Sequence, residues 1–286
     1  MASVSHYYPA LAEIIETLQV ERLDEHRFRA TQLDNPAHHI VGGHIGGQAV
    51  MAAALTAPGR TAHSVHTYYV RPGDASRPVE LRVTAIRDGG TLATRQVTAH
   101  QDEKILLETL ASFSTEIDAP DYHRQCPEVP APETLQPMQA QLADYADELD
   151  GHWVQPRPFA LRYIDPPSRL AVELPEASAR QRLWWRPDGT VPDDPRLHTS
   201  LLTYLSGVTM VETALVMRRA TPASTFNALI DHALWFQRPV DLSDWVLSDQ
   251  VSPSGTGGRG LVNATMYNRS GQLVCTATQE LYFGRG

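Results

Sequence analysis

The sequence predicts an α+β protein built from two similar halves, each with a buried helix wrapped by an antiparallel sheet. The first observation is a repeat, because the segment YYVRPGD at 68–74 recurs as WFQRPVD at 235–241. Two further landmarks follow in each half: a glycine-containing turn before an arginine, and then a strand-like run. They are Arg95 with residues 105–113, and Arg259 with residues 273–283. The three landmarks occur in the same order in both halves and are separated by nearly the same number of residues, which indicates an internal duplication.

Each half also contains a helix that is apolar or small on nearly every face. In the first half, a glycine-rich segment leads into an alanine-rich run that ends at Pro58, which predicts a helix at 43–57. In the second half, Pro195 opens a mostly apolar segment that predicts a helix at 197–216. Helices that are apolar all round are buried. The segments after each helix are rich in Val, Thr, Tyr and Leu, with Gly and Asp turns typical of an antiparallel meander.

A buried helix wrapped by a curved antiparallel sheet is the hot-dog unit, so the predicted architecture is a double hot-dog. We expect an N-terminal unit at 1–115 and a C-terminal unit at 156–286, with their sheets joined into one. The linker at 116–155 is proline-rich and then contains a short acidic helical piece at 139–149. It is predicted to lie ordered over the surface.

Composition narrows the classes of partner and site. The net charge is −9 and no run of Lys or Arg occurs, so nucleic acid is not an expected partner. No apolar run approaches the length of a membrane span, and the N-terminus lacks a signal-peptide pattern. Cys126 and Cys275 are too few for a disulfide framework or a zinc site. We therefore expect a cytoplasmic protein with reduced thiols and no metal.

Several residues could carry chemistry, each with a structural alternative. Four histidines could act as general bases near neutral pH. They are His44, His63, His66 and His232. No Ser or Cys stands in a nucleophile elbow, which argues against a Ser–His–Asp hydrolase. The glycine pairs 42–43 and 46–47 at a helix start offer N–H groups that can bind a carbonyl oxygen, or they serve close packing.

Four arginines and two tryptophans have similar alternatives. The arginines could bind phosphates, but their repeat-related placement favours ion pairs, with Asp74 and Asp241 as nearby partners. They are Arg71, Arg95, Arg238 and Arg259. Trp184 and Trp185 should point to opposite faces of a strand, one of them into the core.

Several segments resemble bacterial acyl-CoA thioesterase II enzymes. The most specific are Arg-Pro-Gly-Asp at 71–74 and the Asp-His…Trp-Phe…Arg-Pro pattern at 231–239. Further matching segments are 42–49, 63–70, 191–194 and 277–280. The resemblance implies a double hot-dog that hydrolyses fatty acyl-CoA to free fatty acid and coenzyme A, without metal or cofactor. It also implies a homodimer or homotetramer, formed through the outer faces of the sheets.

In the family that the chain resembles, an Asp, a Thr and a Gln hold the attacking water. The Gln position is Gln279, but the Thr position is Leu229 and the Asp position is Gly207. Two of the three groups are therefore missing, and a weakened catalytic set is predicted. Asp231 is the candidate replacement, because residues two apart on a strand share a face. Its alternative role is to hold strand ends or His232 by hydrogen bonds. The nearest acid on the second helix, Glu212, should point away.

The predicted catalytic residues are thus Gln279 and Asp231, and the predicted substrate-binding residues are Gly46, Gly47 and His232. Two functions remain open. The first is an acyl-CoA thioesterase of weakened activity, which the retained family motifs favour. The second is a non-hydrolytic acyl-CoA binding or regulatory protein, which the missing Asp and Thr favour. A hot-dog dehydratase is more distant, because its buried His with a nearby carboxylate is not evident.

Overall fold

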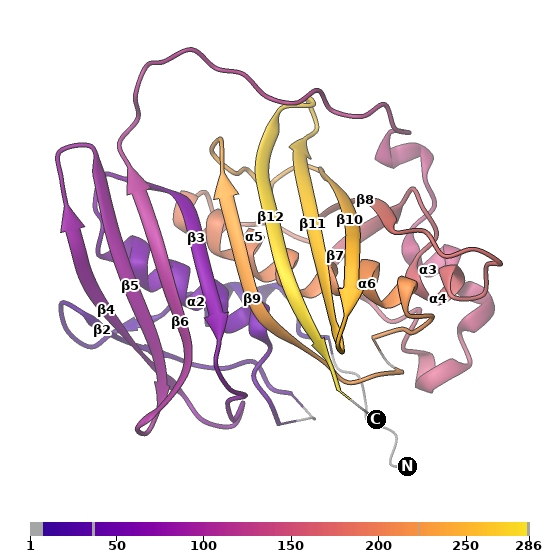
Figure 1. Cartoon of the computed structure of the whole chain (residues 1–286), viewed down its shortest axis with the longest axis horizontal. Coiled ribbons are helices and arrows are strands. Elements are labelled where there is room, and N and C mark those ends of the chain that lie inside the picture. The colour runs from indigo at the N-terminus through magenta and orange to yellow at the C-terminus, as the bar shows by residue number, and fades with distance from the viewer. Residues whose placement is uncertain (1–7, 36–37, 223, 285–286) are drawn as a thin grey trace.

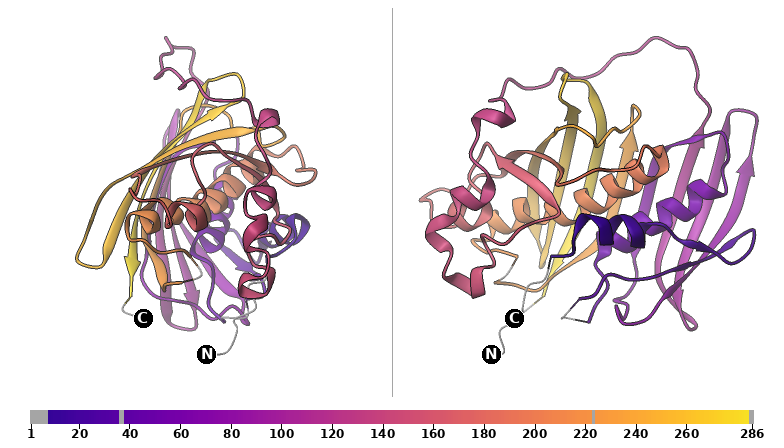
Figure 2. Two further views of the ribbon diagram at one scale, coloured as in Figure 1. Left: turned by 90° about the vertical axis from the view of Figure 1, so that its right-hand side faces the viewer. Right: turned by 180° about the vertical axis from the view of Figure 1, so that it is seen from behind.

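The computed structural model describes residues 8–35, 38–222 and 224–284. Their strands form one twelve-stranded antiparallel sheet in the order β1-β2-β4-β5-β6-β3-β9-β12-β11-β10-β8-β7. The two long helices lie against one face of this sheet, as the view from behind shows (Figure 1, Figure 2). The predicted single sheet with two buried helices is therefore confirmed.

Each half contributes six neighbouring strands. The strands of the first half are β1 (Glu21–Arg22), β2 (Arg27–Ala30), β3 (Thr61–Tyr69), β4 (Val79–Asp88), β5 (Leu92–Gln101) and β6 (Lys104–Ser114). Those of the second are β7 (Phe159–Tyr163), β8 (Arg180–Pro187), β9 (Asn227–Phe236), β10 (Val246–Thr256), β11 (Arg259–Asn268) and β12 (Leu273–Phe283). The halves meet where β3 pairs with β9, from Ser64 opposite Trp235 to Tyr68 opposite Asp231. The two strands in which the copies of the repeated landmark begin are thus neighbours at the centre of the sheet.

The two predicted core helices are α2 (Gly42–Leu55) and α5 (Pro195–Thr209). After a break at Met210, α6 (Val211–Met217) completes the second predicted segment. Residues 43–53 of α2 are all buried, as its uniformly apolar faces predicted. The stretch Pro195–Met217 is long and apolar enough to cross a membrane, but 78% of its most apolar window is buried inside the protein. It is the core helix that the sequence predicted.

Close contact between α2 and α5 depends on glycine. A Cβ atom added at Gly43 would lie 2.6 Å from the carbonyl oxygen of Tyr204. One added at Gly47 would lie 2.7 Å from the carbonyl oxygen of Ser200. Any side chain at these positions would force the helix backbones apart, so the glycines serve the packing of one hot-dog helix on the other.

The remaining helices are short and lie at the periphery. They are α1 (Leu11–Leu18), α3 (Met138–Gln141), α4 (Ser168–Ala171) and the 3₁₀ turns η1 (Pro132–Thr134), η2 (Ala143–Tyr145) and η3 (Glu148–Gly151). The linker runs from β6 along the upper end of the sheet to α3 (Figure 1). Trp184 and Trp185 point to opposite faces, as predicted. Trp185 is in the main core, whereas Trp184 belongs to a second cluster against which linker residues pack. The indole nitrogen of Trp184 donates to the Pro130 carbonyl at 2.9 Å.

The four arginines have the structural role that was favoured, although not with the expected partners. Arg95 is buried and bonds Asp88 at 2.7 Å, and Arg259 bonds Glu280 at 2.9 Å. Arg71 donates to the Ile105 carbonyl, and Arg238 donates to Asp121. The predicted partners were wrong, because the carboxylates of Asp74 and Asp241 instead accept from backbone N–H groups two residues ahead.

Candidate functional site

Three structural elements converge at the positions that the sequence singled out. A Cβ atom added at Gly207, in the last turn of α5, would lie 2.8 Å from Cα of Gly43 and 3.6 Å from Cδ1 of Leu229. The same Leu229 carbon would lie 2.8 Å from a Cβ atom at Gly42. The start of α2, the end of α5 and the strand β9 therefore meet at one point, on the helix side of the sheet.

Gln279 is fully buried in β12, two residues from Leu281, which pairs with Leu229 in the sheet. Neither its amide nitrogen nor its amide oxygen has a hydrogen-bond partner among the described residues. Leaving a buried polar group unpaired costs about 1–3 kcal/mol. Buried amides in folded proteins are therefore almost always bonded to protein, water or ligand. The amide of Gln279 is thus available to hydrogen-bond a water molecule or a substrate, and that it does so stays a prediction.

His232 faces Gln279 directly across the β9–β12 ladder and is also buried. Its Nε2 atom lies 3.2 Å from Oγ of Ser206, the residue before Gly207. Burial lowers the pKa of His232 to about 4, so the ring is neutral at pH 7. The remaining ring nitrogen, Nδ1, is without a hydrogen-bond partner in the part of the chain that the structure describes.

The expectation that Asp231 shares a face with Leu229 is wrong. Asp231 pairs with Glu280, but the next pair along β9 is Leu229 with Leu281, so Ile230 forms a β-bulge. An extra residue resets the alternation of side chains. Leu229 therefore packs toward the helices, whereas Asp231 lies on the other side, opposite Tyr68.

The hydrogen bonding of Asp231 supports its alternative, structural role. Oδ1 of Asp231 accepts from the backbone N–H of Glu280 at 3.0 Å, which ties β9 to β12 at the bulge. Burial raises the pKa of Asp231, and this hydrogen bond opposes the rise. Glu212 is also occupied elsewhere, since it lies in α6 and accepts from the hydroxyl of Tyr163 at 3.2 Å.

The expectation for the glycines needs a similar correction. Gly46 and Gly47 lie in the second turn of α2, where backbone N–H groups are bonded within the helix. They cannot bind a carbonyl oxygen through those groups. The first-turn N–H groups of Gly42 and Gly43 have no partner within the helix. The nitrogen of Gly43 would lie 3.4 Å from a Cβ atom at Gly207, so its N–H is close to the convergence point.

Tyr69 is a polar residue of this site that was not singled out from the sequence. Its hydroxyl oxygen would lie 2.6 Å from a Cβ atom at Gly46, so this glycine makes room for the phenol. Among the described residues this buried hydroxyl has no hydrogen-bond partner. Burial raises the pKa of Tyr69, which keeps the phenol protonated and able to donate. Strand alternation could have placed Tyr69 inward, on the face of the buried Val65 and Thr67.

Two of the other histidines, His44 and His66, make their contacts elsewhere. His44 Nε2 lies 2.9 Å from the hydroxyl of Thr17, in α1. His66 lies on the outer face of the sheet with its ring edge-on to Trp235. In the described ranges, no group of three or more His, Cys, Asp or Glu could hold a metal ion.

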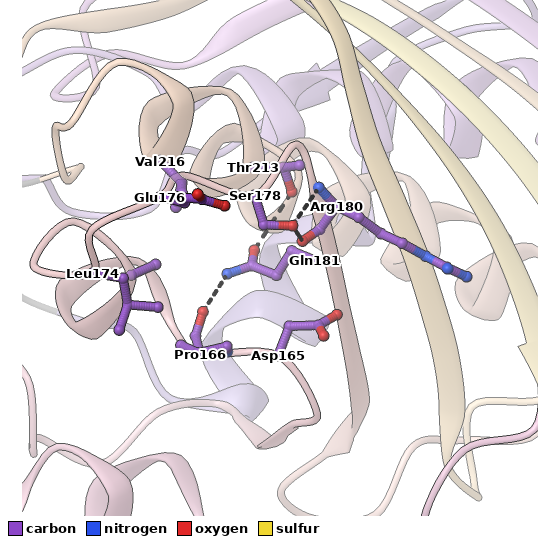
Figure 3. Close-up of a pocket in the computed structure, with 10 residues that line it drawn as sticks. Asp165, Pro166, Leu174, Glu176, Ser178, Arg180, Gln181, Thr213 and Val216 are labelled. Atoms are coloured by element: carbon purple, nitrogen blue, oxygen red, sulfur yellow. Dashed lines mark hydrogen bonds between the residues drawn. The ribbon is translucent and has the colours of Figure 1, made fainter.

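A separate pocket lies between α6 and β8, about 30 Å³ in volume (Figure 3). Its polar wall is already occupied, since Gln181 donates to the Pro166 carbonyl at 3.3 Å and its amide oxygen lies 3.4 Å from the hydroxyl of Thr213. A space of this size holds about one water molecule. It contains none of the converging residues and does not form part of the candidate site.

Comparisons with known proteins found similar families, relatives and solved structures. Residues 163–282 match the family model of acyl-CoA thioesterase, and residues 31–114 match that of the acyl-CoA thioesterase N-terminal domain. Acyl-CoA thioesterase 2 of Haemophilus influenzae is 31% identical over 283 residues, which cover 94% of this chain and 96% of that protein.

Two solved structures of mycobacterial proteins are also similar. A TesB protein of Mycobacterium avium subsp. paratuberculosis is 42% identical with a TM-score of 0.81, and the match covers 96% of this chain and all 100% of that one. The acyl-CoA thioesterase II TesB2 of Mycobacterium marinum is 31% identical with a TM-score of 0.78, covering 97% and 99% of the two chains.

Proposed function

Because the chain belongs to the acyl-CoA thioesterase family, we propose that it hydrolyses fatty acyl-CoA to free fatty acid and coenzyme A at the point where α2, α5 and β9 converge. The observation that carries the proposal is the buried Gln279 amide, whose oxygen and nitrogen lack partners among the described residues. Water is the nucleophile. The N–H of Gly43 and the hydroxyl of Tyr69 are positioned to donate to the carbonyl oxygen as negative charge develops on it.

The activity is expected to be low. Gly207 and Leu229 stand where the family has an acid and a hydroxyl, and groups that activate a nucleophile by proton transfer contribute on the order of 10²–10⁴ in rate. The same two residues favour a second candidate, a protein that binds acyl-CoA without hydrolysing it. A thioether analogue that binds, combined with no release of coenzyme A, would establish this second function instead.

The test is a steady-state assay of coenzyme A release with thiol detection, across acyl chain lengths. We expect Gln279→Ala to lower the rate at least tenfold without lowering the melting temperature, because its amide bonds no described residue. The matched control is Gln250→Ala on β10. Gln250 is equally buried, but its amide accepts from Thr213 at 2.7 Å and contacts Ser248 at 3.1 Å.

Gln250→Ala should therefore lose stability and keep the rate. The opposite pattern, a destabilised Gln279→Ala with unchanged turnover, would place the reaction elsewhere. Comparing two buried glutamines in one sheet separates a loss of chemistry from a general loss of packing.

We also propose a homodimer or homotetramer that forms through the outer face of the central strands. His66 lies opposite Leu110 on this face, and the neighbouring Tyr68 is 63% exposed, Leu110 49% and Trp235 39%. Large exposed apolar groups that gather on one face are typical of protein interfaces. A cytoplasmic location is proposed as well, supported by Cys126 and Cys275, which are both free.

A further inference from the structure

His232 and Gln279 form a pair with unpaired hydrogen-bonding atoms in a site that lacks the family's Asp and Thr. They occupy directly opposite positions of the β9–β12 ladder, where Cβ atoms are about 4.5–5.5 Å apart. Yet the amide of Gln279 and Nδ1 of His232 have no direct hydrogen bond to each other or to any other described residue. A water molecule between them would satisfy both.

The proton on the neutral imidazole can be placed from its neighbours. The hydroxyl of Ser206 is within 3.2 Å of the Thr203 carbonyl, to which it donates, and within 3.2 Å of His232 Nε2. Because a hydroxyl has one hydrogen, Ser206 then accepts from Nε2–H, and Nδ1 is left with a free lone pair.

We propose that His232 is a catalytic residue of the thioesterase reaction, whose Nδ1 lone pair orients and deprotonates the attacking water together with Gln279. As the water oxygen bonds to the thioester carbon, one of its protons passes to Nδ1. When the carbon–sulfur bond breaks, Nδ1 returns that proton to the departing sulfur. The products are the carboxylic acid and the thiol of coenzyme A, and no other reactant is needed.

Ser206 is a positioning residue in this scheme, because it fixes the tautomer without touching the water. The strand position of His232 fits the role of the ring. It projects to the helix side of β9, as Leu229 does, whereas Asp231 between them does not. The low basicity that burial gives the ring explains how this acceptor can function at neutral pH yet be a weak substitute for an ionised acid.

The test compares two variants, each with a side-chain amide that can replace one of the two ring nitrogens. In His232→Asn the side-chain amide oxygen can take the place of Nδ1, but the contact with Ser206 is lost. In His232→Gln the amide nitrogen can take the place of Nε2 and keep Ser206, but the acceptor at Nδ1 is lost. An amide can orient a water but cannot take its proton, so we expect coenzyme A release to fall at least 100-fold in both variants. The fall should be larger in His232→Gln, which also loses the acceptor that orients the water.

A purely structural histidine predicts the reverse order, with His232→Gln the more active and more stable variant, and that result would overturn the inference. Nitrogen NMR of labelled wild-type protein gives a readout independent of activity. It should show a protonated Nε2 and a bare Nδ1, and the opposite tautomer would also overturn the proposal.

The inference rests on the proposed function, and the two fail differently. If the wild type releases no coenzyme A from any acyl-CoA, the hydrolase function fails and the role of His232 with it. If the wild type is active and both variants keep its activity, only the role of His232 fails.

Discussion

Restoring the missing acid and hydroxyl is the most demanding test of where the site lies. The change is Gly207→Asp together with Leu229→Thr. A Cβ atom at position 207 would lie 2.8 Å from Cα of Gly43, whereas carbon atoms normally pack about 3.5–4.0 Å apart. The start of α2 must therefore move away from α5 before any side chain fits. Leu229→Thr shortens the side chain that lies 3.6 Å from the same point, which makes room for the carboxylate.

The stability cost follows from these contacts. Overpacking of this kind costs about 1–3 kcal/mol, and a carboxylate without an ion-pair partner in a half-buried site adds to it. We expect Gly207→Asp alone to lose about 2–4 kcal/mol, which a domain stable by about 5–15 kcal/mol tolerates. The double variant should lose less than the sum of the two single changes, because they share one contact.

Turnover should move in the opposite direction. An acid and a hydroxyl that activate the water together can restore on the order of 10²–10⁴ in rate, and the double change should exceed either single change. The assay is coenzyme A release, measured beside the melting temperature. Gly207→Ala is the matched control, since it introduces the same backbone contact without a carboxylate, and its rate should not rise.

Two results would refute the reasoning. A folded double variant that binds a thioether analogue but is no faster than Gly207→Ala would show that the water is not held at this point. A gain in rate that survives the addition of Gln279→Ala would show that Gln279 does not hold the water.

Two further predictions concern the protein as a whole. Burial lowers the pKa of His232 to about 4 and that of His44 to about 3, whereas both are 6.5 in the unfolded chain. The free energy of unfolding is therefore highest above pH 6.5, and it decreases as the pH falls toward the folded pKa of each histidine. Each histidine should cost about 2 kcal/mol at pH 5, partly offset by Glu212, whose raised pKa acts in the opposite direction. Urea unfolding of wild type and His232→Asn at pH 7.5 and pH 5 should show a smaller acid loss in the variant, and equal losses would contradict burial of His232 as a cause of the acid sensitivity. For the assembly, light scattering should give a multiple of 31.7 kDa that Trp235→Asp reduces, whereas a 31.7 kDa wild-type particle at micromolar concentration would exclude the oligomer.

The fold could be predicted because its signals are local and repeated. The uniformly apolar segments at 43–57 and 197–216 became α2 and α5 with α6, close to the predicted bounds. The repeated landmark then identified equivalent strands in the two halves. The position of β3 and β9 at the centre of the sheet depends on their pairing with each other, which no local pattern encodes.

The site was predicted in part, and the errors have physical causes. Gly207, Leu229 and Gln279 were placed by motif. The structure brings Gly207 and Leu229 close together, and Gln279 lies two residues along β12 from the partner of Leu229. Asp231 was misplaced because a bulge at Ile230 breaks the alternation of side chains, and bulges leave little trace in one sequence. The role of Gly46 changed because the helix begins at Gly42, so the second glycine pair lies inside it. Tyr69 was missed because its place in the site depends on Gly46, where the absence of a side chain leaves room for the phenol.

The polar groups of the candidate site are either hydrogen-bond donors or hydrogen-bond acceptors. Which of the two kinds is depleted predicts whether KM or kcat is affected. The donors suited to a carbonyl oxygen are intact, namely the N–H of Gly43, the hydroxyl of Tyr69 and the amide nitrogen of Gln279. The acceptors suited to a water are depleted, since an ionised acid at position 207 is absent and only neutral acceptors, on Gln279 and His232, are left. Donors bind the thioester carbonyl oxygen in the ground state, and these hydrogen bonds strengthen as negative charge develops on that oxygen. Acceptors, in contrast, contribute only when the water attacks. We therefore expect the wild type to have an ordinary KM for acyl-CoA and a low kcat. Steady-state kinetics that instead give a high KM with an ordinary kcat would contradict this division.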